Sequence, residues 1–203
     1  LATYGLDEVV AHVEEPISRT EEDATVAESR IGNALTDALR WRADADVAIS
    51  PVGALRSGDP LEGDVTVAEL VGLSPYRDEL AVLSLSGDRL RETLLELPLG
   101  YHHEDFPARQ CSHVSGASIV FDDAAGRLRE ATVGGDLIDP EREYTLAVAD
   151  YLVETDHVTS AFGPADVIDH CGVARDAVVE YAREVGLSPE IGGRIERPTL
   201  EES

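Results

Sequence analysis

Residues 28–56, ESRIGNALTDALRWRADADVAISPVGALR, carry the clearest signals of secondary structure in the chain. The first half places apolar residues three and four positions apart, which predicts a helix that we extend over residues 26–43. The short apolar run that follows, rich in β-branched residues, predicts a buried strand over residues 47–50. This strand leads into a loop, residues 51–64, that carries one arginine, Arg56. Because α/β folds often bind ligands where a buried strand ends, this loop is the first candidate for a functional site.

Elements outside this stretch are predicted from periodicity and turn residues. Thr66 and Glu69 form a capping-box pattern, which predicts that a short helix begins there. The other expected elements are an amphipathic helix over 2–12, an extended segment over 14–19, an acidic surface loop at 21–23, a strand over 80–85, a helix over 87–95, an irregular stretch over 100–112, strands over 114–121, 128–133 and 144–149, a hairpin turn at 134–136, a loop over 151–163, a helix over 174–185 and a tail from 192. This order, helical first and then rich in strands, favours a layered α/β fold over a doubly wound sheet.

The composition is strongly acidic: the formal net charge is −25, and all 16 basic residues are arginine. A nucleic-acid partner is disfavoured, because such binding needs a basic face that displaces counterions. Strong acidity produces self-repulsion at low ionic strength, which molar salt screens. We therefore expect an acidic surface and a salt-loving source organism.

Membrane and targeting signals are absent from the sequence. No apolar stretch approaches the roughly 20 residues that a membrane span requires, and no secretion-signal pattern is found at the start. The sequence contains no methionine, so we expect it to be a processed or excised piece of a longer chain.

Two cysteines, Cys111 and Cys171, leave the redox compartment open, because they can pair, stay reduced or bind a metal. His113 and His170 add soft metal ligands beside them, but the spacing is not that of a standard zinc site. An independent enzyme built on this Cys/His group is therefore the least favoured hypothesis, and a disulfide is favoured over a metal site if the protein is exported. Residues 102–105 carry ligand-type side chains that point apart on an extended chain, and are interpreted as a polar loop.

Six segments, taken in order, resemble the C-terminal domain of the 5′-nucleotidase family, in which this domain follows a metallophosphoesterase domain. They are the opening Glu28…Gly32-Asn33…Asp37-Ala38, ADVAIS…LR at 45–56 (compare ADIAL-T-NGGGIR), SPYRDEL at 74–80 (LPFGNTL), LSGDRL at 85–90 (ELTGAELKEAL), VSGASIVFD at 114–122 (VSGLRYTYD), and VGGDLIDP at 133–140 with YTLA at 144–147 (VNGKPLDPDKTYTVA). Each segment alone is a weak match, but the collinear series over roughly residues 27–163 is specific.

The resemblance implies a four-layer α/β/β/α fold for residues 26–197, a substrate-binding domain. Residues 1–25 would then be a connector helix and linker from an N-terminal domain, and residues 198–203 a tail. It also implies that the chemistry belongs to two divalent metal ions in that other domain, so that no catalytic residue or cofactor is expected in this chain. Family members are typically exported or attached to the cell surface, which favours an extracytoplasmic location.

The resemblance further implies a nucleotide or nucleoside site. An arginine at the Arg56 position grips the anionic end of the nucleotide, and guanidinium is well suited to such binding. An aromatic residue at the Tyr76 position stacks on the base, and Phe162 is the candidate for the second aromatic. The more common role for such a phenylalanine, packing in the core, is the alternative. Gly53, in the loop before Arg56, matches one of the three glycines in the NGGGIR segment of the family.

Departures from the family pattern support an alternative hypothesis. The family asparagine of NGGGIR falls on Pro51, and only Gly53 remains of its three glycines. The GGDGF loop is missing from the aligned span 154–159, and Phe162 matches its aromatic only across a gap. In the alternative, the domain has lost the nucleotide pocket and serves as a structural or interaction domain.

Three polar residues in the first matching segments are given local roles. Asn33 is expected to bond backbone within its helix, Asp37 to be a charge on the helix surface, and Asp46 to sit at the entry of the strand.

Overall fold

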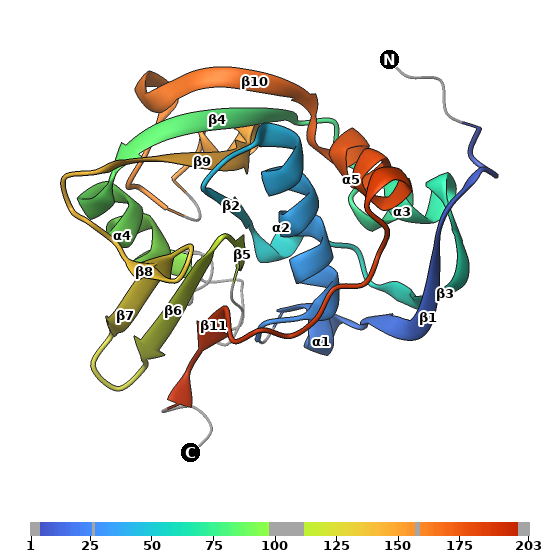
Figure 1. Ribbon diagram of the computed structural model, residues 1–203, viewed down its shortest axis with the longest axis horizontal. Coiled ribbons are helices and arrows are strands. Elements are labelled where there is room, and N and C mark those ends of the chain that lie inside the picture. The colour runs from blue at the N-terminus through green and yellow to red at the C-terminus, as the bar shows by residue number, and fades with distance from the viewer. Residues whose placement is uncertain (1–4, 26, 98–111, 157–158, 199–203) are drawn as a thin grey trace.

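Three sheets and five α-helices make up the described part of the chain, which a computed structural model gives for residues 5–25, 27–97, 112–156 and 159–198 (Figure 1). The strands are β1 (Val9–Arg19), β2 (Val47–Ser50), β3 (Gly58–Thr66), β4 (Glu79–Ser86), β5 (His113–Ser115), β6 (Ala117–Asp122), β7 (Arg127–Val133), β8 (Asp136–Leu137), β9 (Glu143–Ala149), β10 (Val167–Val173) and β11 (Ile195–Glu196). The helices are α1 (Glu21–Thr25), α2 (Arg30–Ala43), α3 (Val67–Leu73), α4 (Gly87–Glu96) and α5 (Ala174–Glu184), with short 3-10 helices η1 (Val52–Ala54), η3 (Asp150–Leu152) and η4 (Pro164–Asp166).

The central sheet has five strands in the order β10-β4-β9-β2-β5. Strands β2 and β9 are parallel, whereas β4 runs antiparallel to both β9 and β10. It follows that β2, β9 and β10 all point the same way, so their carboxyl ends and the start of β4 meet at one edge of the sheet.

Apolar side chains on the two faces of this sheet belong to two separate cores. Because successive side chains of a strand point to opposite faces, Ala48 packs into the first core, and Val47 and Ile49 pack into the second. The first core contains apolar residues of α2, α3 and α5 and of the β1–β3 pair. The second lies toward α4 and the four-stranded sheet β11-β6-β7-β8. The layered α/β arrangement that the sequence predicts is confirmed.

Helix α2 begins and ends with defined caps and crosses the front of the central sheet (Figure 1). The Ser29 hydroxyl accepts a hydrogen bond from the Gly32 amide at 3.1 Å, and Asp44 closes the helix in the left-handed conformation, with φ of 49°. Gly32 is needed for packing, because a Cβ there would lie 2.2 Å from His113 Nδ1 on β5. The capping box predicted at Thr66 and Glu69 is also present, at the start of α3.

The predicted helix over residues 2–12 is wrong. Residues from Val9 onward form the strand β1, which pairs antiparallel with β3 and buries Val10, Val13 and Ile17 in the first core. The apolar spacing of three and four residues fitted a helix, but the bulges in the β1–β3 register also bring such residues to one face of a strand. The described part of residues 1–25 thus contributes to the core of the domain.

Other differences are local. The predicted loop 51–64 contains η1 and most of β3, the acidic segment 21–23 opens the short helix α1, and β10 and β11 were not predicted. The predicted strand 114–121 is interrupted at Gly116, where φ is +80° and a Cβ would lie 2.1 Å from the Asp46 carbonyl oxygen. The irregular stretch expected over 100–112, including residues 102–105, lies almost wholly outside the described residues.

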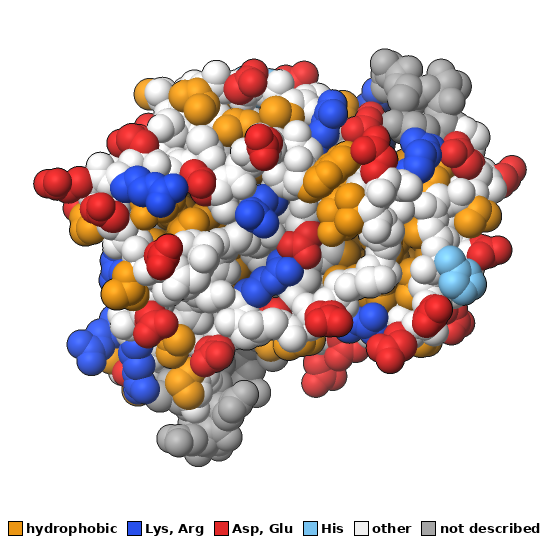
Figure 2. All heavy atoms as spheres, in the orientation of Figure 1, with side chains coloured by type: hydrophobic (Ala, Val, Ile, Leu, Met, Phe, Trp, Pro, Cys, Tyr) orange, Lys and Arg blue, Asp and Glu red, His pale blue; other side chains and the backbone are white. Residues whose placement is uncertain are grey.

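The face of the domain drawn in Figure 2 carries its acidic residues in a dispersed pattern. Figure 2 shows Asp and Glu side chains spread over one whole face, with arginines between them. None of the helices in the described residues is long and apolar enough to cross a membrane.

Candidate functional site

A cavity of about 300 Å³ opens at the edge of the central sheet where the strand ends converge. Its lining residues lie at or just after the carboxyl ends of β2 (Ser50, Pro51), β9 (Ala149, Tyr151) and β10 (Ala174, Arg175). Others come from the segment that leads into β4 (Ser74, Tyr76, Asp78), and further walls come from α2 and η1. In α/β folds this position, outside the carboxyl ends of neighbouring parallel strands, is where ligands commonly bind.

Three of the four predicted site residues lie together at this cavity. The Tyr76 hydroxyl donates a hydrogen bond to the Gly53 carbonyl oxygen at 3.3 Å and accepts one from Arg56 Nη2. The Arg56 guanidinium also lies over the Tyr76 ring, with Cζ 5.0 Å from the ring centroid. Tyr76 and Gly53 line the cavity, and Arg56 stands exposed beside them. The structure therefore forms one cluster from a cation, an aromatic ring and a backbone turn.

Phe162, the fourth predicted residue, does not line this cavity. Its side chain is 7% exposed and packs in the second core, on the other face of the central sheet. The second aromatic side chain at the cavity is Tyr151 of η3, which is 42% exposed. The sequence predicted only that a loop begins at Tyr151. Its position just after the apolar strand β9 could have indicated a place at the cavity, because ligands commonly bind where such strands end.

Two charged residues at the cavity, Asp78 and Arg175, were also missed. Partial burial raises the pKa of Asp78, and the nearby carboxylate of Asp150 raises that pKa further. Arg175 is held by two contacts: Nη1 donates to the Pro75 carbonyl oxygen at 3.3 Å, and Nε lies 3.7 Å from Asp176 Oδ1. The cavity thus presents a donor and an acceptor as well as two aromatic rings.

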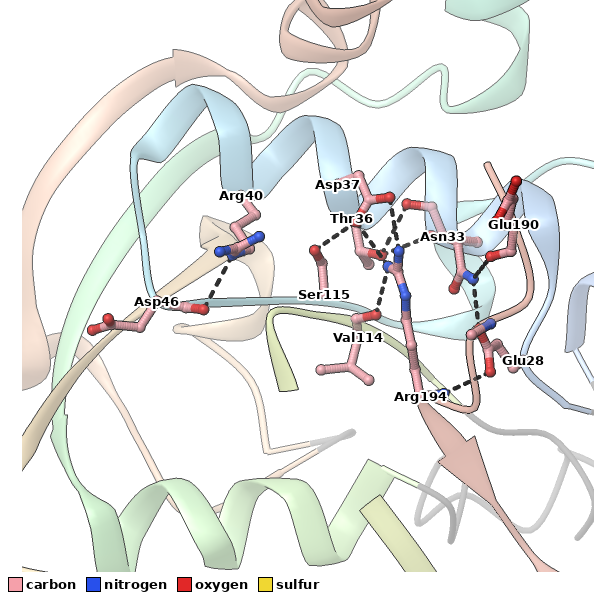
Figure 3. Close-up of polar contacts among 12 residues, drawn as sticks. Glu28, Asn33, Thr36, Asp37, Arg40, Asp46, Val114, Ser115, Glu190 and Arg194 are labelled. Carbon is pink, nitrogen blue, oxygen red and sulfur yellow. Dashed lines mark hydrogen bonds and ion pairs between the residues drawn. The ribbon is translucent and has the colours of Figure 1, made fainter. Parts of the chain in front are cut away.

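The motif residues at the start of α2 hold a distant segment instead of lining the cavity. We call residues 188–197, which follow α5 and include β11, the strap. Glu28 accepts hydrogen bonds from the Gly192 amide at 2.8 Å and the Arg194 amide at 2.7 Å, and Asn33 Nδ2 donates to the Glu190 carbonyl oxygen at 2.7 Å (Figure 3). The local backbone role expected for Asn33 is therefore wrong.

Asp37 completes the attachment of the strap, so its expected role as a helix-surface charge is wrong as well. Arg194 binds it through two hydrogen bonds, Nη1 to Oδ1 at 2.8 Å and Nη2 to Oδ2 at 2.9 Å, and the Ser115 hydroxyl adds a third at 2.6 Å (Figure 3). Arg194 Nη1 also donates to the Val114 carbonyl oxygen at 3.2 Å. Asp46 has the predicted role at the strand entry: its Oδ2 accepts from the backbone amide of Thr145 on β9 at 2.9 Å.

The proposed Cys/His metal group is not supported by the strand order. His113 lies on β5 and His170 and Cys171 on β10, which are the two outer strands of the central sheet. Four strand spacings of about 4.8 Å separate them by roughly 19 Å. Cys111, the possible disulfide partner of Cys171, lies outside the described residues. Within the described ranges, no three His, Cys, Asp or Glu side chains converge in a way that would hold a metal ion.

Comparisons with known proteins give one family match and one curated relative with a similar sequence. A family model described as 5'-nucleotidase, C-terminal domain matches residues 9–163. The trifunctional nucleotide phosphoesterase protein YfkN of Bacillus subtilis is 23% identical over 209 residues, which cover 96% of this chain but only 14% of that protein.

Solved structures resemble this fold at low sequence identity. A 5'-nucleotidase precursor from Thermus thermophilus gives a TM-score of 0.72 at 23% identity, covering 94% of this chain and 39% of that one. A putative 5'-nucleotidase from Staphylococcus aureus gives 0.78 at 17%, covering 95% and 41%. The NAD nucleotidase of Haemophilus influenzae gives 0.78 at 14%, covering 95% and 38%. The chain therefore spans about two fifths of the length of these structural relatives.

Proposed function

Since the chain belongs to the 5′-nucleotidase C-terminal domain family, we propose that it is the substrate-binding domain of a phosphoesterase that hydrolyses nucleotide phosphate esters. The observation that carries the proposal is the Arg56–Tyr76–Gly53 cluster at a cavity formed by converging strand ends. An aromatic ring and a guanidinium in contact suit a ligand that has a flat base at one end and an anion at the other.

Each residue of the cluster has a role in this proposal. Tyr76 stacks on the base, and its hydrogen bond to the Gly53 carbonyl holds the ring in place. The Arg56 guanidinium has five N–H donors, so those not directed at the Tyr76 hydroxyl are available to a phosphate. Tyr151 is the candidate for the second ring at the cavity.

The hydrolytic step is proposed to belong to another domain. The family resemblance places divalent metal ions in an N-terminal metallophosphoesterase domain, and the described residues of this chain do not form a site that fits them. We assign no reaction step to this chain, which in the proposal holds and orients the substrate. The same proposal includes two further points. The family resemblance supports an extracytoplasmic location, and the net charge of −25 supports adaptation to high salt.

Isothermal titration in molar KCl tests the binding role with nucleoside monophosphates and the matching nucleosides. We expect Tyr76→Ala to weaken both ligands by about 1–3 kcal/mol, as the loss of one aromatic stack does in nucleic-acid complexes. Arg56→Ala is expected to weaken the monophosphate more than the nucleoside, because only the monophosphate carries the anion. The matched control is Arg127→Ala, an exposed position on β7 that is not among the residues lining the cavity. This variant should bind both ligands as the wild type does.

The titration also decides between this proposal and the structural or interaction domain. A folded wild-type protein that shows no binding heat and no ligand-dependent rise in melting temperature would establish that the pocket has lost its function.

A further inference from the structure

We propose that Arg175 and Asp78 read the edge of the base in this cavity and select a 6-oxopurine, guanine above hypoxanthine. The inference rests on the proposed nucleotide-binding function and adds the substrate class. Arg175 lies beyond residues 9–163, the part of the chain that the family model matches, so the family pattern gives it no role.

The position of both residues is fixed by the fold. Helix α5 begins where β10 ends, and its first amide, on Ala174, donates to the Asp78 carbonyl oxygen at 2.9 Å. This bond joins the start of α5 to the 75–78 turn that carries Tyr76, so the residues that would read the base edge lie next to the ring that would stack on its face.

Arg175 is restrained in a way that suits recognition. Its side chain is only 19% exposed, Nη1 donates to the Pro75 carbonyl oxygen, and the Asp176 carboxylate lies 3.7 Å from Nε, which makes no hydrogen bond. Among the described residues Nη2 has no hydrogen-bond partner either, so its N–H groups are donors available to a ligand acceptor. A restrained guanidinium loses little conformational entropy on binding, which makes its hydrogen bond more selective.

Asp78 supplies the complementary acceptor. An ionised carboxylate accepts hydrogen bonds through two oxygens and donates none. Guanine presents two adjacent donors on one edge, N1–H and the N2 amine, next to the O6 acceptor. Hypoxanthine keeps O6 and N1–H but lacks the amine. Adenine instead turns an unprotonated N1 toward the carboxylate, so that two acceptors would face each other.

The experiment is a titration of the 203-residue chain with GMP, IMP and AMP in molar KCl, for the wild type and two variants. The wild type is expected to bind GMP most tightly and AMP about tenfold or more weakly, which is the usual discrimination from one well-made base-edge contact. Asp78→Asn replaces one acceptor with a donor, so it should weaken GMP, strengthen AMP and narrow or reverse the ranking. Arg175→Gln should weaken GMP and IMP and leave AMP nearly unchanged.

The Asp78→Asn variant gains affinity for one ligand, a result that loss of folding cannot produce. Asp136→Asn on β8 and Arg127→Gln on β7, both exposed, are the matched controls and should keep the wild-type ranking. Equal affinities for the three nucleotides, or variants that keep the wild-type ranking, would overturn the base-reading inference and leave the nucleotide-binding proposal standing. The absence of binding by all three nucleotides would overturn both.

Discussion

Replacing Arg194 with alanine should destabilise the domain by about 2–3 kcal/mol. The substitution removes the two hydrogen bonds to Asp37 and the one to the Val114 carbonyl, and leaves the Asp37 carboxylate with Ser115. The Arg194 and Asp37 side chains are 21% and 23% exposed. Breaking a fully buried ion pair costs about 3–5 kcal/mol, and this partial exposure lowers the expected value.

A matched pair in the same molecule provides the control. Arg183 Nη2 lies 2.8 Å from Glu8 Oε1, the same distance as the shorter Arg194–Asp37 contact, but the two side chains are 36% and 45% exposed. Surface ion pairs contribute about 0–1 kcal/mol, so Arg183→Ala should change stability by less than about 1 kcal/mol.

Urea unfolding followed by far-UV circular dichroism at constant molar KCl measures both variants. The slope of unfolding free energy against urea should stay constant, so that a change in midpoint reports stability. A double-mutant cycle of Arg194→Ala with Asp37→Ala should give a coupling energy above about 1 kcal/mol. Equal losses for Arg194→Ala and Arg183→Ala, or strictly additive effects in the cycle, would refute the claim that the strap is fastened through this pair.

Two further predictions concern pH and salt. A hydrogen bond from Arg89 is the main cause that lowers the pKa of Asp166 below its ordinary value of 3.8. Because the pKa in the folded state is lower than in the unfolded state, this pair stabilises the fold fully above pH about 4. That stabilisation is lost as the pH falls through the folded-state pKa. Asp166→Asn should remove that part of the acid dependence, which urea titrations between about pH 2 and pH 5 will measure, and an unchanged pH profile would contradict the assignment. The net charge of −25 predicts that the free energy of unfolding rises as KCl increases from low to molar concentration, because screening reduces self-repulsion; a stability that is independent of KCl would show that the acidic side chains repel each other too little to matter.

The parts of the fold that sequence predicted well are those with strong local signals. The strand over 47–50, the capping box at Thr66 and the hairpin turn predicted at 134–136 each depend on a few adjacent residues. All three are confirmed, with Asp136 already the first residue of β8. The elements that were missed depend on distant partners. Strand β10 is an outer strand that pairs with β4 through its backbone, and its largely exposed side chains show no apolar alternation.

The sequence indicated only some of the residues at the candidate site, because the others depend on strands that pair across long sequence distances. Arg56, Tyr76 and Gly53 come from two segments that resemble a known family, and the structure brings them together at the cavity. Asp78 and Arg175 line one cavity only because β4 and β10 are neighbours, a pairing that local sequence does not encode. Phe162 follows the alternative that the sequence also allowed, core packing, since a buried core aromatic and a ligand-stacking aromatic look alike in sequence.

The way the strap is fastened has a consequence for how the chain is made. Glu28 and Asp37 leave the ribosome long before their partners, since Arg194 is 166 positions from Glu28 and 157 from Asp37. During synthesis α2 can form early, but Glu28 and Asp37 lack these partners until the strap has been made, and contacts at such sequence separation form slowly. A nascent chain halted before residue 188 would lack the strap contacts of both carboxylates, so this part of the fold can form only after residues 188–194 have left the ribosome.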